Sequence, residues 1–300
     1  MNQQYLMRSL MFVPAHNQHL LDSALRRDAD VLLLDIEDSV PPCDKQAARN
    51  NIKEFVARDD TQGKLIFPRV NDRESGELLR DLYQLTIPGV SGFMYPKSNK
   101  EEDVYFVGKL LETIEYEKGF PIGTFKVIPI IETAGAVMQI EAICKACPNR
   151  VVAVAFGCED YVTSIHGQHD SEGQSIFWAR NMIVNGARAC GVLPIDTVHI
   201  NVHDLDDLEK NLIISKKLGF EGMLVLNPKE LPLVHKYYSP SEDEMAWAEE
   251  MVRLYNESQE EGKGVALKNG KFVGPPMLKM AENILTKNAL IRKRNQDVNG

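Results

Sequence analysis

Two carboxylates stand where the chain leaves two successive apolar segments. Glu132 directly follows the run 126–131, and Asp160 comes shortly after the run 151–156. Neighbouring strands of a sheet lie about 5 Å apart, so carboxylates at two adjacent strand ends could reach one cation. Two carboxylates completed by water and substrate oxygens suit Mg²⁺, and Mn²⁺ accepts the same oxygen ligands. An ion pair of each carboxylate with Lys or Arg is the alternative, but their joint position favours a metal site.

One arginine, Arg69, ends another apolar segment. Its guanidinium group is a planar fork of N–H donors that matches a carboxylate, which predicts a small carboxylate-bearing substrate. Arg69 could instead balance the acids Asp35 or Glu37, and it could do both.

Three acids, Asp35, Glu37 and Asp38, lie within four residues of one another. Like charges at this spacing disfavour ionisation, so they need nearby cations or water. We expect them to form a second layer around the metal or to include a carboxyl with a raised pKa. Asp38 could instead cap a helix that begins at Ser39.

Eight short apolar segments, rich in β-branched residues, alternate with longer amphipathic segments. The predicted strands are 9–13, 31–36, 65–70, 92–95, 126–131, 151–156, 197–202 and 223–226. The predicted helices include 17–27, 45–58, 74–85, 102–115, 204–218 and 231–237. Apolar strands that alternate with helices indicate a parallel sheet covered by helices. Eight such units predict a closed (β/α)8 barrel, a TIM barrel.

Polar residues gather where these segments end, and in a TIM barrel all strand ends surround the active site. They are Asp35, Glu37, Asp38, Arg69, Asn71, Lys97, Glu132, Glu159, Asp160, His199, Asn201 and Asn227.

The pattern changes near residue 238. We assign 1–238 to the barrel and 239–300 to a C-terminal helical extension, with helices over 244–260 and 277–290 and a Gly- and Pro-rich loop over 263–276. We expect this extension to dock on the barrel or on a neighbouring subunit.

Composition narrows the choice of partners. The 300 residues carry a net charge of −9, which disfavours nucleic acid or an anionic membrane as a partner. No apolar run approaches the roughly 20 residues of a membrane span, and the first residues do not form a signal peptide, which predicts a cytoplasmic protein. Cys144 and Cys147 form a CxxC in the helical pattern 136–147 without a second pair, so we interpret them as packed thiols.

Several motifs, in order, resemble those of the citrate lyase β-subunit family, within the HpcH/HpaI aldolase and malyl-CoA lyase superfamily. They are 8–15 (RSLMFVPA), 29–42 (ADVLLLDIEDSVPP), 45–49 (KQAAR), 68–71 (PRVN), 95–97 (YPK), 131–134 (IETA) and 156–160 (FGCED).

The resemblance implies a TIM barrel, Mg²⁺ dependence and a reversible C–C cleavage beside a thioester. Glu132 and Asp160 would be the metal ligands, and Arg69 the ligand of the substrate carboxylate. The turn from Gly157 through Glu159 to Asp160 would help to bind a 2-oxo acid such as oxaloacetate. The resemblance also implies CoA or an acyl carrier as partner, and a homotrimer or hexamer.

Two positions depart from the family pattern. Asn227 precedes Pro228 where the family carries His, and Gly274 stands where it carries an Asp. A glycine cannot act as a base, so the general base stays open.

Three functions follow from these residues. The first is a Mg²⁺-dependent carbon–carbon lyase that joins or separates a 2-oxo acid and an acetyl thioester. The second is an aldolase on free 2-oxo or hydroxy acids. The third is a non-catalytic barrel subunit that binds carboxylates.

Overall fold

The computed structural model describes residues 5–170, 173–260, 266–268 and 271–299. By their internal contacts the residues form two compact units. One is Met7–Val234, and the other is His235–Gly300 together with the residues before Met7. The division falls within helix α10 (Leu231–Tyr238). The role of residues 239–300 as a docking extension stays a prediction.

The first unit is a closed barrel of eight parallel strands in sequential order, which confirms the predicted TIM barrel. Its strands are β1 (Ser9–Pro14), β2 (Val31–Asp35), β3 (Leu65–Arg69), β4 (Gly92–Tyr95), β5 (Lys126–Ile131), β6 (Ala153–Phe156), β7 (Leu193–Asp196) and β8 (Gly222–Val225).

Burial explains why these segments are strands. Every residue of β2, β4, β6 and β8 is buried, as expected for strands covered by side chains inside the barrel and by helices outside. The barrel closes because β1 pairs with both β2 and β8. In this register Asp35, the last residue of β2, lies beside Arg69, the last residue of β3.

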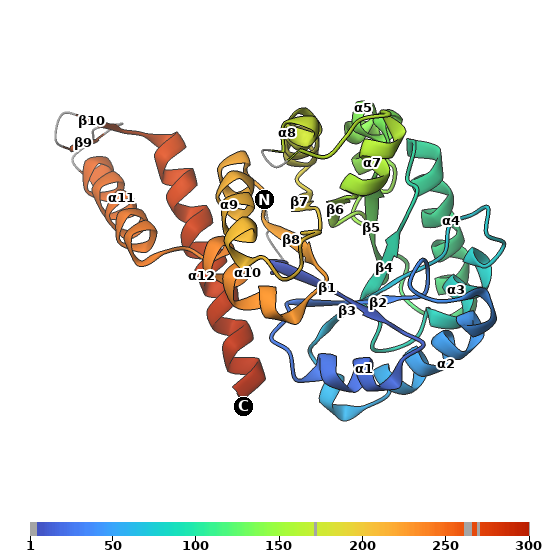
Figure 1. Ribbon diagram of the computed structural model, residues 1–300. Helices are drawn as coiled ribbons and strands as arrows, with labels where there is room; N and C mark the ends of the chain where they lie inside the picture. The colour runs from blue at the N-terminus through green and yellow to red at the C-terminus, as the bar shows by residue number, and fades with distance from the viewer. Residues whose placement is uncertain (1–4, 171–172, 261–265, 269–270, 300) are drawn as a thin grey trace. The chain divides into compact units, whose positions relative to one another are not determined.

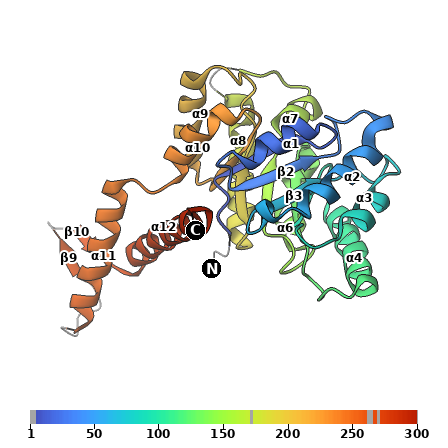
Figure 2. The same ribbon diagram turned by 90° about the horizontal axis from the view of Figure 1, so that it is seen from below.

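Helices surround the strands (Figure 1). They are α1 (Gln18–Leu25), α2 (Lys45–Val56), α3 (Leu78–Leu85), α4 (Glu101–Lys118), α5 (Ala134–Met138), α6 (Ile140–Lys145), α7 (Cys158–Ser164), α8 (Gln174–Ala189), α9 (Leu205–Leu218) and α10, with short 3-10 turns at Pro42–Asp44, Asp59–Thr61 and Pro228–Glu230. Figures 1 and 2 both show α2, α3 and α4 side by side on the outside of the barrel. No described helix is long and apolar enough to cross a membrane.

The predicted strand 197–202 is wrong. β7 is Leu193–Asp196, and 197–202 forms an irregular loop after it. The β-branched residues of the loop resemble a strand, whereas Pro194 argues against the true one. Pro194 nevertheless fits, because its position pairs with Val154 of β6 and its carbonyl accepts the N–H of Glu221 at 3.0 Å.

The C-terminal unit contains α11 (Glu242–Glu260) and α12 (Pro275–Asn299). The predicted loop 263–276 is wrong in part, since β9 (Ala266–Lys268) and β10 (Lys271–Val273) pair antiparallel; 263–265 and 269–270 lie outside the described residues. Helix α12 also runs beyond the predicted 277–290. A small buried apolar cluster is formed by Ala248, Met251, Val273 and Ala281.

Candidate active site

Glu132 and Gly157 lie side by side at the carboxyl ends of β5 and β6. The preceding residues Ile131 and Phe156 are register partners in the sheet. A Cβ atom on Gly157 would lie 2.8 Å from Cβ of Glu132 and 3.0 Å from its Oε2, closer than real Cβ contacts. A glycine is therefore needed at position 157 for the Glu132 side chain to occupy its place.

The Glu132 carboxylate is buried with little compensation for its charge. Glu132 is only 7% exposed. Its Oε1 accepts a short hydrogen bond from the backbone N–H of Lys97. Burial and the negative charge of Asp160 raise the pKa of Glu132 to about 7, against the effect of that hydrogen bond. Asp160 itself is exposed, in the first turn of α7.

Neither carboxylate has an ion-pair partner among the described residues. In that part of the chain no side-chain nitrogen of Lys or Arg lies within 4.0 Å of a carboxylate oxygen of Glu132 or Asp160, although the charges of Arg69 and Lys97 act on Glu132 from farther away. The ion-pair alternative for these two carboxylates therefore finds no support. Two uncompensated carboxylates are a donor set that fits a hard divalent cation.

The described residues contain no group of three or more His, Cys, Asp or Glu arranged to hold a metal ion. Zn²⁺ sites take three or four such ligands, whereas Mg²⁺ commonly takes one or two carboxylates and completes its shell with water and substrate. The donor set thus fits Mg²⁺ better than zinc. Glu132 and Asp160 are the residues that could hold it.

Arg69 forms a two-pronged ion pair with Asp35. Nε and Nη2 lie 2.7 and 2.8 Å from the two carboxylate oxygens of Asp35. Burial disfavours the charged form of Asp35, but the hydrogen bonds and charge of Arg69 outweigh it and hold the pKa of Asp35 below its ordinary value. The guanidinium also lies over the Phe12 ring, with Cζ 4.8 Å from the ring centroid.

The remaining Arg69 nitrogen, Nη1, lies 3.0 Å from Glu37 and 3.7 Å from Asp38. Arg69 therefore does balance the acids that follow β2, which is the structural alternative for this residue. A role in binding the substrate carboxylate stays a prediction.

Glu37 is the second carboxyl with a raised pKa. Burial is the largest cause; the charges of Asp38 and Glu132 add to it and, against the charge of Arg69, bring the pKa of Glu37 to about 7. Lys45 fixes the backbone here, because its Nζ donates to the carbonyl of Glu37 at 2.9 Å. The expectation of a raised pKa among the three acids agrees with this geometry.

Helix capping by Asp38 is wrong, since no helix begins at Ser39. Asp35 accepts the backbone N–H groups of Glu37 and Ser39, at 3.0 and 3.2 Å. Asp38 is exposed on the rim of the site. Asp35 thus serves two purposes, as the anchor of Arg69 and as the acceptor that shapes the turn after β2.

Two further residues, Lys97 and Asp72, border the site and were not assigned a role from the sequence. Lys97 follows β4, and its Nζ forms a short ion pair with Asp72 and lies 3.9 Å from Glu37. The resemblance of residues 95–97 to a family motif was the available signal for Lys97. Asp72 carried none, because its ion pair joins loops that are distant in sequence.

Other predicted residues have partners of their own. Glu159 is exposed and lies 3.1 Å from Nε2 of His169. His199 follows β7 rather than ending a strand, and its Nε2 lies 2.9 Å from Asp207. Asn227 caps the turn Pro228–Glu230. Gly274 belongs to the C-terminal unit, so its relation to the barrel site stays a prediction.

The structure agrees with the packed-thiol interpretation of the CxxC. Cys144 is buried, and burial raises the pKa of its thiol. A Cβ on Gly108 of α4 would lie 2.1 Å from Sγ of Cys147. Because Gly108 has no side chain, the Cys147 thiol can pack against α4 at this position.

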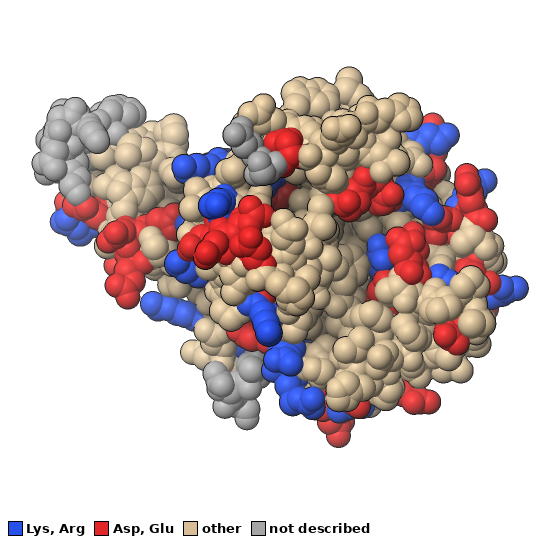
Figure 3. Space-filling view, viewed as in Figure 1, with Lys and Arg blue, Asp and Glu red and all other residues tan. Residues whose placement is uncertain are grey.

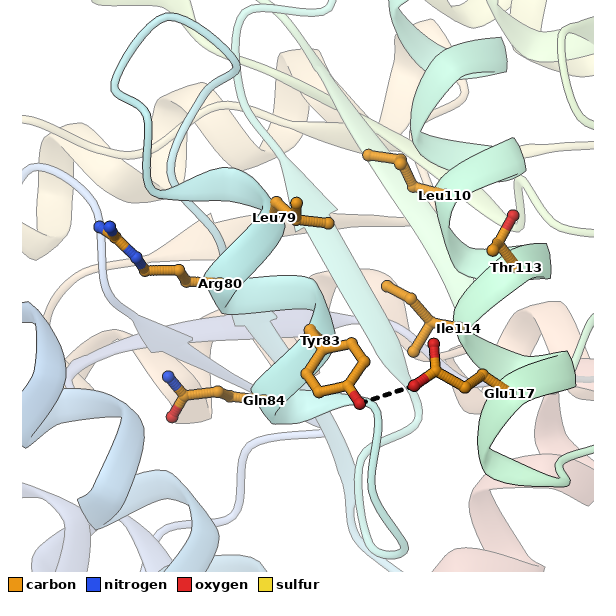
Figure 4. A pocket seen from close by; sticks show the side chains of 8 residues that line it. All are labelled: Leu79, Arg80, Tyr83, Gln84, Leu110, Thr113, Ile114 and Glu117. Atoms are coloured by element: carbon orange, nitrogen blue, oxygen red, sulfur yellow. Dashed lines mark hydrogen bonds between the residues drawn. The ribbon is translucent and has the colours of Figure 1, made fainter.

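A pocket of about 460 Å³ lies between α3 and α4 on the outside of the barrel (Figure 4). Tyr83 donates a hydrogen bond to Glu117 across it at 2.8 Å. None of the residues predicted to do chemistry lines this pocket. The candidate site is instead the carboxyl ends of the strands, and Figure 3 shows Asp and Glu side chains gathered beside a hollow in the barrel unit, with Lys and Arg among them.

The fold defines the class of protein, a TIM barrel with carboxylates gathered at the carboxyl ends of its strands. The model of the HpcH/HpaI aldolase/citrate lyase family matches residues 8–228. The chain belongs to this family.

Two lyases are similar to this chain over most of its length. Citrate lyase subunit beta of Leuconostoc mesenteroides subsp. cremoris is 29% identical over 285 residues, which cover 95% of this chain and 94% of the relative. The mitochondrial citramalyl-CoA lyase of Homo sapiens is 30% identical over 297 residues, covering 96% and 87%. The prediction of a lyase is confirmed at the level of the family; these names do not decide the substrate.

A solved structure is also similar over nearly the whole chain. The protein CitE from Mycobacterium tuberculosis, in complex with magnesium, acetoacetate and coenzyme A, is 26% identical with a TM-score of 0.73. The match covers 93% of this chain and 97% of that protein.

Proposed function

We propose that this chain is a Mg²⁺-dependent carbon–carbon lyase that cleaves or forms the bond between a 2-oxo acid, such as oxaloacetate, and an acetyl thioester. The observation that carries this proposal is the buried Glu132 carboxylate, which feels the charge of Asp160 and has no ion-pair partner among the described residues. The binding of magnesium and coenzyme A by a similar protein supports it.

Glu132 and Asp160 would hold the metal at the barrel mouth. Bound Mg²⁺ supplies positive charge that polarises a carbonyl and stabilises negative charge developing on its oxygen. Because burial raises the pKa of Glu132 to about 7, the metal-free carboxyl is only partly ionised at neutral pH, and a bound cation would favour its ionised form. The close approach of Gly157 limits how far the carboxylate can turn away.

Arg69 would orient the substrate carboxylate. Its ion pair with Asp35 fixes the guanidinium plane, and a fixed donor loses less entropy on binding than a free side chain. Glu37, 3.0 Å from Arg69, can hold or release a proton near neutral pH. It is therefore a candidate for the proton exchange that Gly274 cannot perform.

Substrate assays test this function. Citryl-CoA, malyl-CoA and citramalyl-CoA are offered with and without Mg²⁺, and the released oxo acid is measured. We expect cleavage of at least one thioester that requires Mg²⁺, lost in Glu132→Gln and kept in Glu141→Gln, which removes an exposed carboxylate on α6. Absence of thioester cleavage under all conditions would reject the proposal.

The second candidate, an aldolase on free 2-oxo or hydroxy acids, is favoured by Gly274, which stands where the family pattern has an acid. Turnover of free hydroxy-oxo acids but of no thioester would support it. Mg²⁺-dependent binding of oxaloacetate without any turnover would instead indicate a carboxylate-binding subunit.

We further infer that the acyl group is carried by CoA or an acyl-carrier protein, and that the chain forms a homotrimer or hexamer. The resemblance to the family supports these two inferences. A cytoplasmic location stays a prediction from the sequence pattern. Light scattering of the purified protein measures the oligomer directly, and a monomeric mass would reject the oligomer.

A further inference from the structure

The loop after β4 forms two hydrogen bonds with the residues that follow β5. The backbone N–H of Lys97 donates to Oε1 of Glu132, and Oδ1 of Asn99 accepts from the Thr133 hydroxyl at 2.9 Å. Two adjacent residues of one strand end are thus held by two residues of the neighbouring loop. Thr133 in turn caps α5, because its side chain accepts the N–H of Ala136 at 3.2 Å.

Lys97 has a left-handed backbone conformation where it donates this hydrogen bond. Its φ is 52°, one of three positive values among the described residues other than glycine. A residue with a Cβ adopts this conformation at a cost, and such residues cluster at functional sites where the surroundings hold them. Two contacts hold the turn: Ser98 donates its hydroxyl to the Tyr95 carbonyl at 3.1 Å, and the Asn99 N–H donates to the Lys97 carbonyl at 2.9 Å.

The backbone conformation links the two contacts to β5. The N–H of Lys97 lies before its φ bond and Asn99 lies after it. A change in the sign of φ would therefore swing Asn99 away while Glu132 kept its place, or carry the N–H away while Asn99 stayed. In the structure both contacts are made together with Lys97 in the left-handed conformation.

The Lys97 side chain points to other partners. Its half-exposed ammonium group pairs with Asp72 and lies 3.9 Å from Glu37, and it acts on Glu132 only through its charge. The side chain and the main chain of this residue thus contact different carboxylates, so substitutions can separate their contacts.

We propose that Lys97 is a positioning residue for the Glu132 carboxylate, and that it acts through its left-handed main chain rather than through its ammonium group. The inference rests on the proposed function, in which Glu132 is a metal ligand. With Oε1 fixed by Lys97 and the side chain packed on Gly157, the carboxylate is held ready to bind a cation without first being ordered.

The test measures Mn²⁺ affinity of the purified full-length protein by electron paramagnetic resonance, which needs no substrate. Lys97→Gly and Lys97→Asn remove the ammonium group but favour the left-handed backbone, so affinity should stay within about threefold of the parent. Lys97→Val and Lys97→Ala disfavour that backbone, so affinity should fall by about tenfold, with valine the weaker binder. Asp72→Asn, which breaks the ammonium pair alone, should bind as the parent does.

Two results would overturn the inference. Equal losses in Lys97→Gly and Lys97→Val would assign the effect to the side chain, and parent-like affinity in both Lys97→Val and Lys97→Ala would remove the main-chain role. Thermal unfolding of each variant confirms that it is folded, and Lys97→Ala carries the test if the valine variant does not fold.

Glu132→Gln separates this inference from the proposed function. If that variant binds Mn²⁺ as the parent does, Glu132 is not a metal ligand and the proposed function fails with the inference. If it loses Mn²⁺ binding while Lys97→Val does not, only the positioning role is rejected.

Discussion

Glu115 and Glu132 are both buried glutamates of the barrel unit, yet their surroundings differ in every respect that matters for charge. Glu115 accepts two hydrogen bonds from Arg150, at 2.9 and 2.8 Å, and two from backbone N–H groups. Those bonds outweigh the cost of burial and lower its pKa, whereas the pKa of Glu132 is raised to about 7. The paired carboxylate of Glu115 stabilises the fold, whereas Glu132, which has no ion-pair partner among the described residues, is the carboxylate that we propose binds a cation.

Removing the charge of Glu115 should have the largest effect on stability. Glu115→Gln leaves Arg150 buried without its partner, which costs roughly 3–5 kcal/mol of unfolding free energy. Denaturant unfolding measures this change. Mn²⁺ affinity of the folded variant should be unchanged. A large loss of affinity would contradict a purely structural role for Glu115.

The same substitution at Glu132 should act on function instead. Glu132→Gln should lower kcat/KM at least about a hundredfold, because a ligand that holds the stabilising charge is lost. Its metal-free unfolding free energy at pH 8 should stay the same or rise, since a buried charge is removed. Steady-state kinetics measures the change in kcat/KM, and denaturant unfolding measures the change in unfolding free energy. A Glu132→Gln variant that stays active but is less stable would contradict the functional role of Glu132.

The pH dependence of stability should have opposite signs for the two glutamates. The raised pKa of Glu132 means that the folded, metal-free protein binds more protons than the unfolded chain between pH 4.5 and about 7. Its contribution is therefore fully present below pH 4.5 and is lost as pH rises through about 7, by on the order of 3 kcal/mol. The lowered pKa of Glu115 makes its contribution present above pH 4.5 and lost as pH falls through the folded-state pKa.

Mg²⁺ makes this prediction specific. It binds the ionised form of Glu132, so it should raise the midpoint of thermal unfolding more at pH 8 than at pH 6. The difference should vanish in Glu132→Gln and persist in Glu115→Gln. Equal stabilisation by Mg²⁺ at both pH values in the parent would place the metal elsewhere.

Arg69 should give the smallest of these effects under a conservative change. Arg69→Lys keeps the positive charge beside Asp35 and Glu37 but loses the two-pronged geometry. We expect kcat/KM to fall by about tenfold, with KM raised and kcat lowered together, because one contact both binds and orients the substrate. Unchanged kinetic constants would remove Arg69 from substrate binding and leave it as the counter-charge of Asp35.

The sequence predicted the barrel because each strand is a local apolar run bounded by helical patterns. It failed at β7, where the β-branched loop 197–202 resembled a strand more than the true segment Leu193–Asp196 did. It also missed the hairpin of β9 and β10, whose three-residue strands are too short to show a period. These failures share one cause, since tertiary pairing decided the structure of segments with weak or misleading local patterns.

At the candidate site, residue type and position at a strand end predicted Glu132, Asp160 and Arg69. The partners of these residues could not be predicted in the same way. The ion pair of Lys97 with Asp72 joins the loops after two neighbouring strands, β3 and β4, and the need for Gly157 comes from the side chain at the end of β5. Such contacts depend on the closed arrangement of the strands rather than on any pattern along the chain.

The central claim is that Glu132 and Asp160 together hold a divalent metal at the mouth of the barrel. Anomalous X-ray diffraction from crystals grown with Mn²⁺, which replaces Mg²⁺ at oxygen sites, tests it most directly. The account predicts an anomalous peak about 2 Å from a carboxylate oxygen of each residue, and no such peak in Glu132→Gln. A peak at other residues, or none in the parent protein, would contradict it.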